Sequence, residues 1–287
     1  MPVLVVANNK GGVGKTTISE IICIAGALGN KRVLGIDMDP QCNFSRRFLA
    51  MEVDPFDPEI IRPPVSDEHD PIAEPESDGR GSSADIFFKG TTISYPTAYS
   101  GLEIIPGHSK DLLNVERVTH DEVSKKVHQQ LAGWMEDAEI DNEFDLVVID
   151  TGPSKGPLTT SAMHSATHMM IPAEMEELSV EGLYGMLAYW SMQNLQRVPG
   201  ETLELIGILA NKFDKRLPIH QHYYDSLKSS DRIGPLLFPE KMHYWQDYKE
   251  SSMADGTPVL KLPPSNKTRK EAEAICGEIL KRIFSHE

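Results

Sequence analysis

The chain has 287 residues, of which 40% are hydrophobic and 25% charged, and its formal net charge is −15. This composition is typical of a globular protein, so it excludes collagen-like, coiled-coil and wholly disordered chains, and no apolar run approaches the ~20 residues of a membrane span. The net charge argues against nucleic-acid binding, but most of the acidity lies in one segment, since residues 50–85 hold 11 acids against 2 bases. Residues 209–287 hold 13 bases against 11 acids, so the C-terminal third could still present a basic face.

The chain opens with a strand, a glycine-rich turn, a helix and a second strand. Residues 2–7 are a short apolar run rich in valine, typical of a strand buried on both faces, and residues 15–28 are predicted to form a helix. Residues 32–36 are predicted as the next strand. This order begins an α/β fold, so we expect a mostly parallel twisted sheet flanked by helices on both faces.

Residues 50–100 interrupt this pattern, because they are acidic and carry six prolines between Pro55 and Pro75. Such a segment makes a poor core, so we expect an exposed, partly mobile insertion that behaves as a solvated loop. Nothing in its sequence supports a partner-binding role. Residues 1–287 are otherwise expected to form a single domain.

The α/β pattern then resumes. Strands are predicted over 102–106, 144–149, 168–172, 203–210 and 235–238, and helices over 120–135, 158–167, 180–196, 219–229 and 267–284. In the last of these helices apolar residues recur at helical spacing, which indicates a packed face.

The most specific motif lies between the first strand and the first helix, and it consists of Lys10, Gly11, Gly12, Val13, Gly14, Lys15, Thr16 and Thr17. Glycines here let backbone N–H groups surround phosphate oxygens, and the helix N-terminus adds positive potential. Lys15 is suited to bridge the β- and γ-phosphates, and the Thr16 hydroxyl to ligate Mg²⁺. The strict P-loop pattern requires glycine where Asn9 stands, so this is the deviant form with an extra lysine at its start.

Two aspartate motifs follow at predicted strand ends. Residues 37–41 read Asp-Met-Asp-Pro-Gln, and residues 144–151 end a hydrophobic strand at Asp150. Together with the P-loop, in this order, they resemble the ParA/Soj partition ATPases, in the wider ParA/MinD group of deviant Walker ATPases. The resemblance covers nearly the whole chain apart from residues 50–100.

The resemblance implies a role for each motif. In this family the residue matching Lys10 reaches across a dimer interface to the partner's nucleotide, which implies an ATP-sandwich homodimer. Asp39 matches the carboxylate that positions the attacking water, Asp37 lies near Mg²⁺ and its waters, and Asp150 is the Walker B acid. Read alone, Asp37 and Asp39 would also suit a turn at a strand end.

The sequence departs from the family pattern at two positions. Gly152 stands where the family usually has proline, and it should loosen this segment, which leaves the rate of hydrolysis and its coupling to dimerisation open. Cys42 stands where the family usually has glycine, and we interpret it as a small buried hydrophobic residue rather than a reactive thiol.

Residues 211–214 bear on which base is bound. On their own, Asn211, Lys212 and Asp214 match the NKxD signature with which GTPases bind guanine. The resemblance implies instead that Asn211 hydrogen-bonds adenine and that Asp214 caps the following turn. We therefore favour ATP, with Mg²⁺, over GTP.

Non-specific binding of double-stranded DNA in this family needs basic residues on one face of the dimer. Lys267, Arg269 and Lys270 cluster at the start of the last predicted helix, with Lys215 and Arg216 in another loop. A few phosphate contacts per subunit would give weak, salt-sensitive binding. A solvated helix start explains the same residues equally well.

Other chemically capable side chains are interpreted as surface or packing residues, namely His164, His168, His220, His222, Trp134, Trp190 and Trp245. His164 and His168 have a spacing that could hold zinc, but the glutamate that a zinc protease needs does not follow His164. The three cysteines are too widely spaced for a CxxC metal site.

Three functions follow from these interpretations. The first is a cytoplasmic, nucleoid-associated DNA-partition switch, whose ATP-bound dimer binds DNA and is released when a ParB-type adaptor stimulates hydrolysis. The second is a MinD-like positioning ATPase acting on membrane or a protein cargo, but the sequence stops directly after the last helix, so we expect no membrane partner. The third, a reductase or ligase of the same fold, lacks the paired cysteines or a recognisable substrate site.

Overall fold

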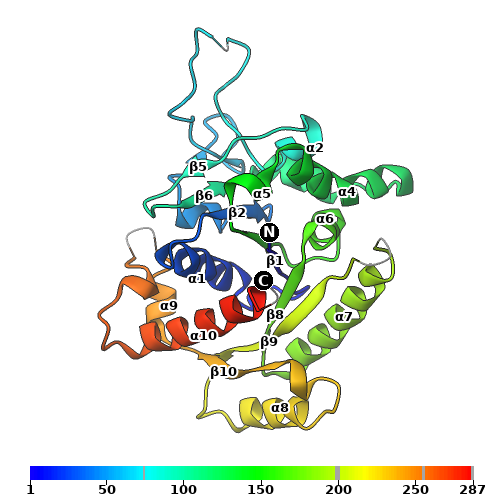
Figure 1. Ribbon diagram of the computed structural model, residues 1–287, viewed down its shortest axis with the longest axis vertical. Coiled ribbons are helices and arrows are strands. Elements are labelled where there is room, and N and C mark those ends of the chain that lie inside the picture. Colours follow the sequence, from blue (N-terminus) through cyan, green and yellow to red (C-terminus); the bar gives the residue numbers. More distant parts are fainter. Residues whose placement is uncertain (74, 198–200, 254–255, 286–287) are drawn as a thin grey trace.

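The fold is built on a sheet of eight strands within residues 1–73, 75–197, 201–253 and 256–285, which are the residues that the computed structural model describes (Figure 1). In the order in which they lie side by side, the strands are β10 (Leu237–His243), β9 (Glu204–Phe213), β8 (His168–Glu174), β1 (Val3–Val6), β7 (Leu146–Thr151), β2 (Val33–Met38), β6 (Leu102–Ile105) and β5 (Tyr95–Pro96). All neighbours are parallel except β5 and β6, which are antiparallel. The predicted mostly parallel sheet is therefore confirmed.

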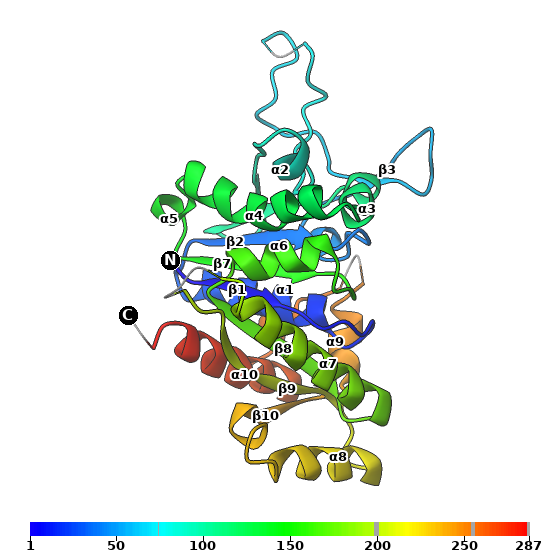
Figure 2. The ribbon, with the colours of Figure 1, turned by 90° about the vertical axis from the view of Figure 1, so that its right-hand side faces the viewer.

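Helices cover both faces of this sheet (Figures 1 and 2). On one face α1 (Lys15–Leu28) packs against α10 (Lys267–Ile283), and on the other α4 (Asp121–Asp137) packs against α6 (Pro157–Ser165), which contacts α7 (Glu177–Asn194). The shorter described elements are η1 (Ser45–Arg47), β3 (Glu52–Val53), β4 (Ile61–Arg62), α2 (Asp85–Phe88), α3 (Ser109–Glu116), α5 (Ile140–Glu143), α8 (Pro218–Lys228), η2 (Gly234–Leu236), α9 (Gln246–Glu250) and η3 (Val259–Lys261).

The two faces of the sheet bury separate sets of apolar side chains. On β1, Val3 and Val5 join the core beneath α4 and α6, whereas Leu4 and Val6 join the core beneath α1 and α10. Successive side chains of a strand point to opposite faces, so a strand covered on both sides must be apolar throughout. This is why the central strands are recognisable as uninterrupted apolar runs.

Each strand and helix predicted from the sequence overlaps an element of the same type, and the first helix is confirmed from Lys15 to Leu28. The sequence pattern does not predict the short helices α2, α3, α5 and α9. Helices of one or two turns carry too few apolar positions for a periodic pattern to be detected.

The insertion is only partly the exposed loop that its composition predicts. Ala84 and Ile86 are fully buried, and the Ser83 hydroxyl donates a hydrogen bond to the carbonyl oxygen of Asp37. Beyond them β5 adds to the edge of the sheet. The expectation of a poor core is therefore wrong for this second part, because a few apolar residues suffice to dock it. The chain between β4 and α2 does extend away from the sheet (Figure 2).

The carboxyl ends of the parallel strands converge on one edge of the molecule. There β1 leads into the P-loop, and Asp37 of β2 lies directly opposite Asp150 of β7. Parallel α/β sheets bind their ligands outside these strand ends. Among the described residues, no helix combines the length and apolar character needed to cross a membrane.

Candidate nucleotide site

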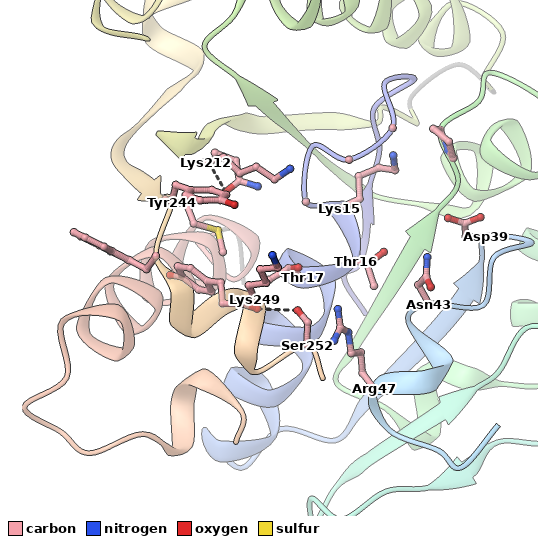
Figure 3. Close-up of a pocket in the computed structure, with 18 of the residues that line it drawn as sticks. Lys15, Thr16, Thr17, Asp39, Asn43, Arg47, Lys212, Tyr244, Lys249 and Ser252 are labelled. Carbon is pink, nitrogen blue, oxygen red and sulfur yellow. Dashed lines mark hydrogen bonds between the residues drawn. The ribbon is translucent and has the colours of Figure 1, made fainter. Parts of the chain in front are cut away.

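A cavity of about 630 Å³ opens at these strand ends (Figure 3). Its volume is in the usual range for a small-molecule or cofactor site. Of the residues predicted to bind nucleotide or act in catalysis, the cavity is lined by Gly11, Gly12, Gly14, Lys15, Thr16, Thr17, Asp39 and Asn211. Lys10, Val13, Asp37 and Asp150 lie outside its lining, so the structure brings most, but not all, of the predicted residues to one surface.

The P-loop backbone requires glycine at two positions. Gly12 and Gly14 have φ angles of 78° and 90°, a region that residues with side chains rarely adopt. A Cβ atom on Gly14 would also lie 2.0 Å from Nδ2 of Asn211. The absence of that Cβ lets Asn211 donate a hydrogen bond of 2.6 Å to the carbonyl oxygen of Val13. Asn211 therefore joins β9 to the P-loop, and its predicted hydrogen bond to adenine stays a prediction.

The two lysines of the P-loop differ in their surroundings. Lys15 is buried, and its Nζ donates to the carbonyl oxygen of Lys10 at 3.2 Å. Burial lowers the pKa of Lys15, while the charges of Asp150 and Asp39 oppose this shift. The Lys10 side chain is half-buried and has neither an ion pair nor a hydrogen bond to the residues described. Its predicted contact with the nucleotide of a second subunit stays a prediction.

A hydroxyl and a carboxylate suited to Mg²⁺ lie below the P-loop. Thr16 Oγ1 donates to Asp150 Oδ2 at 2.8 Å, and Ser19 Oγ donates to Asp150 Oδ1 at 2.9 Å. Mg²⁺ takes oxygen ligands and keeps several waters, so one hydroxyl beside one carboxylate fits this ion when a nucleotide supplies phosphate oxygens. The described residues contain no group of three or more His, Cys, Asp or Glu side chains that could hold a metal by themselves.

Asp37 is buried beside Asp150, but its carboxylate accepts hydrogen bonds from the segment that follows β2. Its Oδ2 accepts hydrogen bonds from the backbone N–H and the hydroxyl of Ser45, at 2.8 and 2.6 Å, and its Oδ1 accepts from the N–H of Asp39 at 3.1 Å. Burial raises the pKa of both Asp37 and Asp150. A bound cation would favour the charged form of both carboxylates. The placement of Asp37 near Mg²⁺ and its waters stays a prediction.

Asp39 faces the cavity from the turn after β2. Its Oδ1 accepts a hydrogen bond of 3.0 Å from the N–H of Gln41, the turn geometry that the Asp-Pro sequence also suggests. Burial raises the pKa of Asp39. A Cβ atom on Gly152 would lie 3.2 Å from this carboxylate, so glycine at this position leaves the Asp39 side chain room to move.

Cys42 occupies a backbone conformation that favours glycine, with φ of 51°. Its side chain is fully buried, and burial raises the pKa of its thiol, as do the nearby charges of Asp37 and Asp39. A thiol held in its neutral form is a poor nucleophile. The interpretation of Cys42 as a small buried hydrophobic residue is therefore confirmed.

One wall of the cavity was not predicted from the sequence. It is formed by Met242, His243, Tyr244, Trp245, Tyr248, Lys249 and Ser252. Glu271 of α10 holds this wall, since it accepts hydrogen bonds from the His243 backbone and ring, from Trp245 Nε1 at 3.1 Å and from the Tyr248 hydroxyl at 3.3 Å. Trp245 also stacks on His243, so it packs as expected and additionally lines the site. The closely spaced aromatic residues from 244 to 248 were the available signal.

The NKxD-like segment does not present its acid to the cavity. Asp214 accepts hydrogen bonds from the Arg216 backbone N–H at 2.9 Å and from its guanidinium at 2.7 to 3.2 Å. Lys212 forms an ion pair of 3.0 Å with Glu174. Asp214 therefore caps its own turn, as the resemblance implies, and is not poised to bind guanine.

The three basic residues proposed for DNA contact lie at the start of α10, and their side chains make different contacts. Lys267 Nζ sits 3.7 Å from the centre of the Trp245 ring, and Arg269 pairs with Glu273 at 2.7 Å. Lys270 is exposed and makes no ion pair with a described residue. Neither lysine therefore forms an ion pair with a described residue, and the contact of the three residues with DNA stays a prediction.

The histidines and the remaining tryptophans have structural contacts. His164 Nε2 lies 2.9 Å from Gln193 Oε1, and His220 Nδ1 accepts from the Asp214 N–H at 2.9 Å. Trp134 is buried, and Trp190 Nε1 donates to the carbonyl oxygen of Leu203. These contacts confirm the packing interpretation for His164, His220, Trp134 and Trp190.

A protein-family model described as an AAA domain (AAA_31) matches residues 1–202. Among curated proteins, the chromosome partitioning protein ParA of Myxococcus xanthus is 25% identical over 284 residues, which cover 98% of this chain and 88% of that protein. The chromosome-partitioning ATPase Soj of Thermus thermophilus is 28% identical over 229 residues, covering 79% and 75% of the two chains.

Solved structures show the same fold. Apo McdA of Cyanthece superposes with a TM-score of 0.72 at 21% identity, covering 98% of this chain and 99% of the other. A putative plasmid partition protein of Borrelia burgdorferi bound to AMPPNP gives 0.71 at 20% identity, covering 98% and 99%. Cobyrinic acid a,c-diamide synthase of Mycobacterium smegmatis with ADP and magnesium gives 0.70 at 22% identity, covering 100% and 97%. Since these proteins have different names and one fold, the fold by itself does not select a function.

Proposed function

This chain belongs to the AAA domain family and is a deviant Walker A P-loop protein of the ParA/Soj type, and from that premise we propose that it is an ATP-hydrolysing DNA-partition protein. We take residues 1–287 as one ATPase domain that acts as a homodimer. The curated relatives named as chromosome partitioning proteins cover most of the chain, which favours this function over the ligase that shares the fold.

The observation that carries the proposal is the arrangement around the P-loop. Lys15, the Thr16 hydroxyl and Asp39 face one cavity, and Asp150 holds Thr16 from below at 2.8 Å. P-loop backbone N–H groups and Lys15 would hold the β- and γ-phosphates, while Thr16 and Asp150 would hold Mg²⁺ directly and through water. When bound, this ion would neutralise negative charge on the phosphates.

Hydrolysis in this proposal depends on Asp39 and Lys10. Asp39 lies at the cavity wall with Gly152 against it, so its carboxylate has room to orient a water molecule for attack on the γ-phosphate. The Lys10 side chain has no hydrogen bond or ion pair among the described residues of its own chain, which supports a role at the nucleotide of a second subunit. Two chains would then enclose their nucleotides between them.

The proposed cargo-moving cycle uses DNA as the surface. The ATP-bound dimer would bind double-stranded DNA without sequence preference, with Lys267, Arg269 and Lys270 as the candidate contacts, in the cytoplasm on nucleoid DNA. A ParB-type adaptor would stimulate hydrolysis and release the subunits. No membrane partner is proposed.

The test is binding to random-sequence duplex DNA with ATP or ADP across a salt series, using Asp39→Ala to hold the ATP state. We expect the variant to bind and dimerise with ATP while turnover falls about 100-fold, and DNA binding to require ATP and weaken steeply with salt. Wild-type turnover in Asp39→Ala would remove the water-positioning role. Absence of DNA binding with either nucleotide, while turnover is intact, would contradict the partition function.

A further inference from the structure

A loosely paired buried carboxylate lies beneath the cavity, outside the residues assigned so far. Glu20, in the second turn of α1, is 4% exposed, and its Oε2 has no hydrogen-bond partner among the described residues. The nearest cation is Arg47, whose Nε lies 3.5 Å away and is also buried without a partner. This distance is too long for a good hydrogen bond, so the two groups attract each other only electrostatically. The terminal nitrogens of the guanidinium stay available to bind another group.

The guanidinium of Arg47 faces the cavity. Arg47 is part of the cavity lining, and Figure 3 shows its terminal nitrogens between Ser252 and Thr16. These nitrogens make no hydrogen bond or ion pair with any residue that the structure describes. Guanidinium groups bind phosphate through two parallel N–H donors. Arg47 therefore presents an unused two-point donor beside the start of the phosphate-binding helix.

Three lysines also line the cavity, and of these Lys249 is exposed and makes no ion pair with a described residue. Lys212 pairs with Glu174 at 3.0 Å, and Lys15 is close enough to Asp150 and Asp39 for their charges to act on its pKa. A nucleoside di- or triphosphate adds several negative charges to a site that already holds these carboxylates. A further cation at the phosphate side would be attracted to them.

We propose that Arg47 binds a phosphate oxygen of the nucleotide, and that Glu20 positions its guanidinium from below. The proposal rests on the nucleotide site described above and adds a contact from η1, which follows the turn that carries Asp39. Arg47 and Asp39 both belong to the segment after β2. Nucleotide binding at Arg47 would therefore also order the turn that holds Asp39.

The experiment measures the Kd of ADP and of ATP with Mg²⁺ for the full chain and for two arginine variants. Arg47→Gln is expected to weaken both nucleotides about 10- to 100-fold, because it removes a charge-assisted contact. Arg46→Gln is the matched control, since Arg46 is the preceding residue, is exposed and does not line the cavity. It is expected to change either Kd by less than about twofold. Wild-type affinity in Arg47→Gln would overturn the proposal.

A double variant separates contact with the nucleotide from support of the fold. If Arg47 serves only as the counter-ion of Glu20, the Glu20→Gln/Arg47→Gln variant would regain wild-type affinity, which would overturn the proposal. A double variant as weak as Arg47→Gln supports it. Equal Kd values of wild type and Arg47→Gln for 2′,3′-dideoxy-ADP would place the contact on a ribose hydroxyl and also overturn it. Failure of the wild-type chain to bind any nucleotide would instead contradict the proposed function itself.

Discussion

On the proposed function, the cavity has a phosphate end at the P-loop and a base end at the aromatic wall, and the two ends are built from different kinds of contact. At the phosphate end, Gly12, Gly14, Lys15 and Thr16 come from one continuous stretch, and their own backbone conformation creates the binding surface. The proposed base end is the wall over residues 242–252, which Glu271 of α10 holds in place.

The comparison shows two ways of making a rigid site. A backbone loop before a helix can hold phosphate with few side chains, because its N–H groups and the helix N-terminus do the binding. A surface for a base needs flat or apolar side chains, and these keep their positions only through contacts made elsewhere in the fold. The two ends should therefore respond differently to substitution.

The largest effect is expected at the phosphate end from Lys15→Ala. This change removes the buried ammonium group beside the P-loop, so the Kd of ATP should rise about 1000-fold, as measured by equilibrium titration. Lys10→Ala is the control, since Lys10 does not line the cavity of its own chain and should leave the affinity of the monomer within a few fold. Equal losses in the two variants would contradict the division of roles between the lysines.

At the proposed base end, Glu271→Ala should remove the hydrogen bonds that position the aromatic wall. The change leaves the donors of His243, Trp245 and Tyr248 without their acceptor, so we expect the free energy of unfolding to fall by about 3 kcal/mol and ATP to bind about tenfold more weakly. Urea unfolding and nucleotide titration measure the two effects. Glu273→Ala, on the exposed side of the same helix, should change both only slightly. If both glutamate variants behave alike, Glu271 does not position this wall.

Beneath the phosphate end, Glu20→Gln should change how stability depends on pH. Burial raises the pKa of Glu20 from 4.5 to about 7, against the opposing charge of Arg47, and the charge of Glu20 in turn raises the pKa values of Tyr99 and Cys23. The folded state keeps a proton that the unfolded chain loses, so this carboxyl makes the protein less stable as pH rises from about 4.5 to about 7, by about 3 kcal/mol at most.

Glutamine does not titrate, so the stability of the Glu20→Gln variant relative to wild type should increase through that pH range and level off above it. Urea unfolding at intervals from pH 5 to pH 8, without nucleotide, measures this difference. A difference that stays constant with pH would show that Glu20 titrates near its ordinary pKa.

The smallest effect is expected from Asp214→Ala, directly after β9 and outside the cavity lining. Because this carboxylate is occupied by Arg216, its removal should alter the preference for ATP over GTP by less than about twofold in a competition assay. A selective loss of GTP binding would show that Asp214 reaches the base and that the guanine signature is functional.

The phosphate end was predictable from sequence because its chemistry is local. A glycine run before a helix can be recognised without knowing the rest of the fold, and Asp150 ends an apolar strand that the pattern also identifies. Residues 242–252 offer only closely spaced aromatic residues as a signal, and their place in the site depends on the contacts with Glu271. Arg47 was missed for the same reason, because its proximity to Glu20 arises from the packing of η1 against α1.

The insertion shows the limit of composition as a guide. Its acids and prolines correctly predict the part that extends beyond the sheet, but Ala84 and Ile86 are fully buried. Two apolar residues hardly alter the average composition of fifty residues. Their effect comes from where the neighbouring β5 docks, which is decided by the edge of the sheet and not by the segment alone.

The strand β5 gives the insertion a second consequence. It covers the outer side of β6 with only two residues, and Pro96 has no N–H to offer to a further strand. An open, long strand edge invites pairing with other chains and aggregation, and short edge strands with proline suppress it. The insertion that carries β5 therefore also reduces aggregation through the edge of the sheet. A chain without it would expose β6 to pairing with other copies of the protein in a concentrated solution.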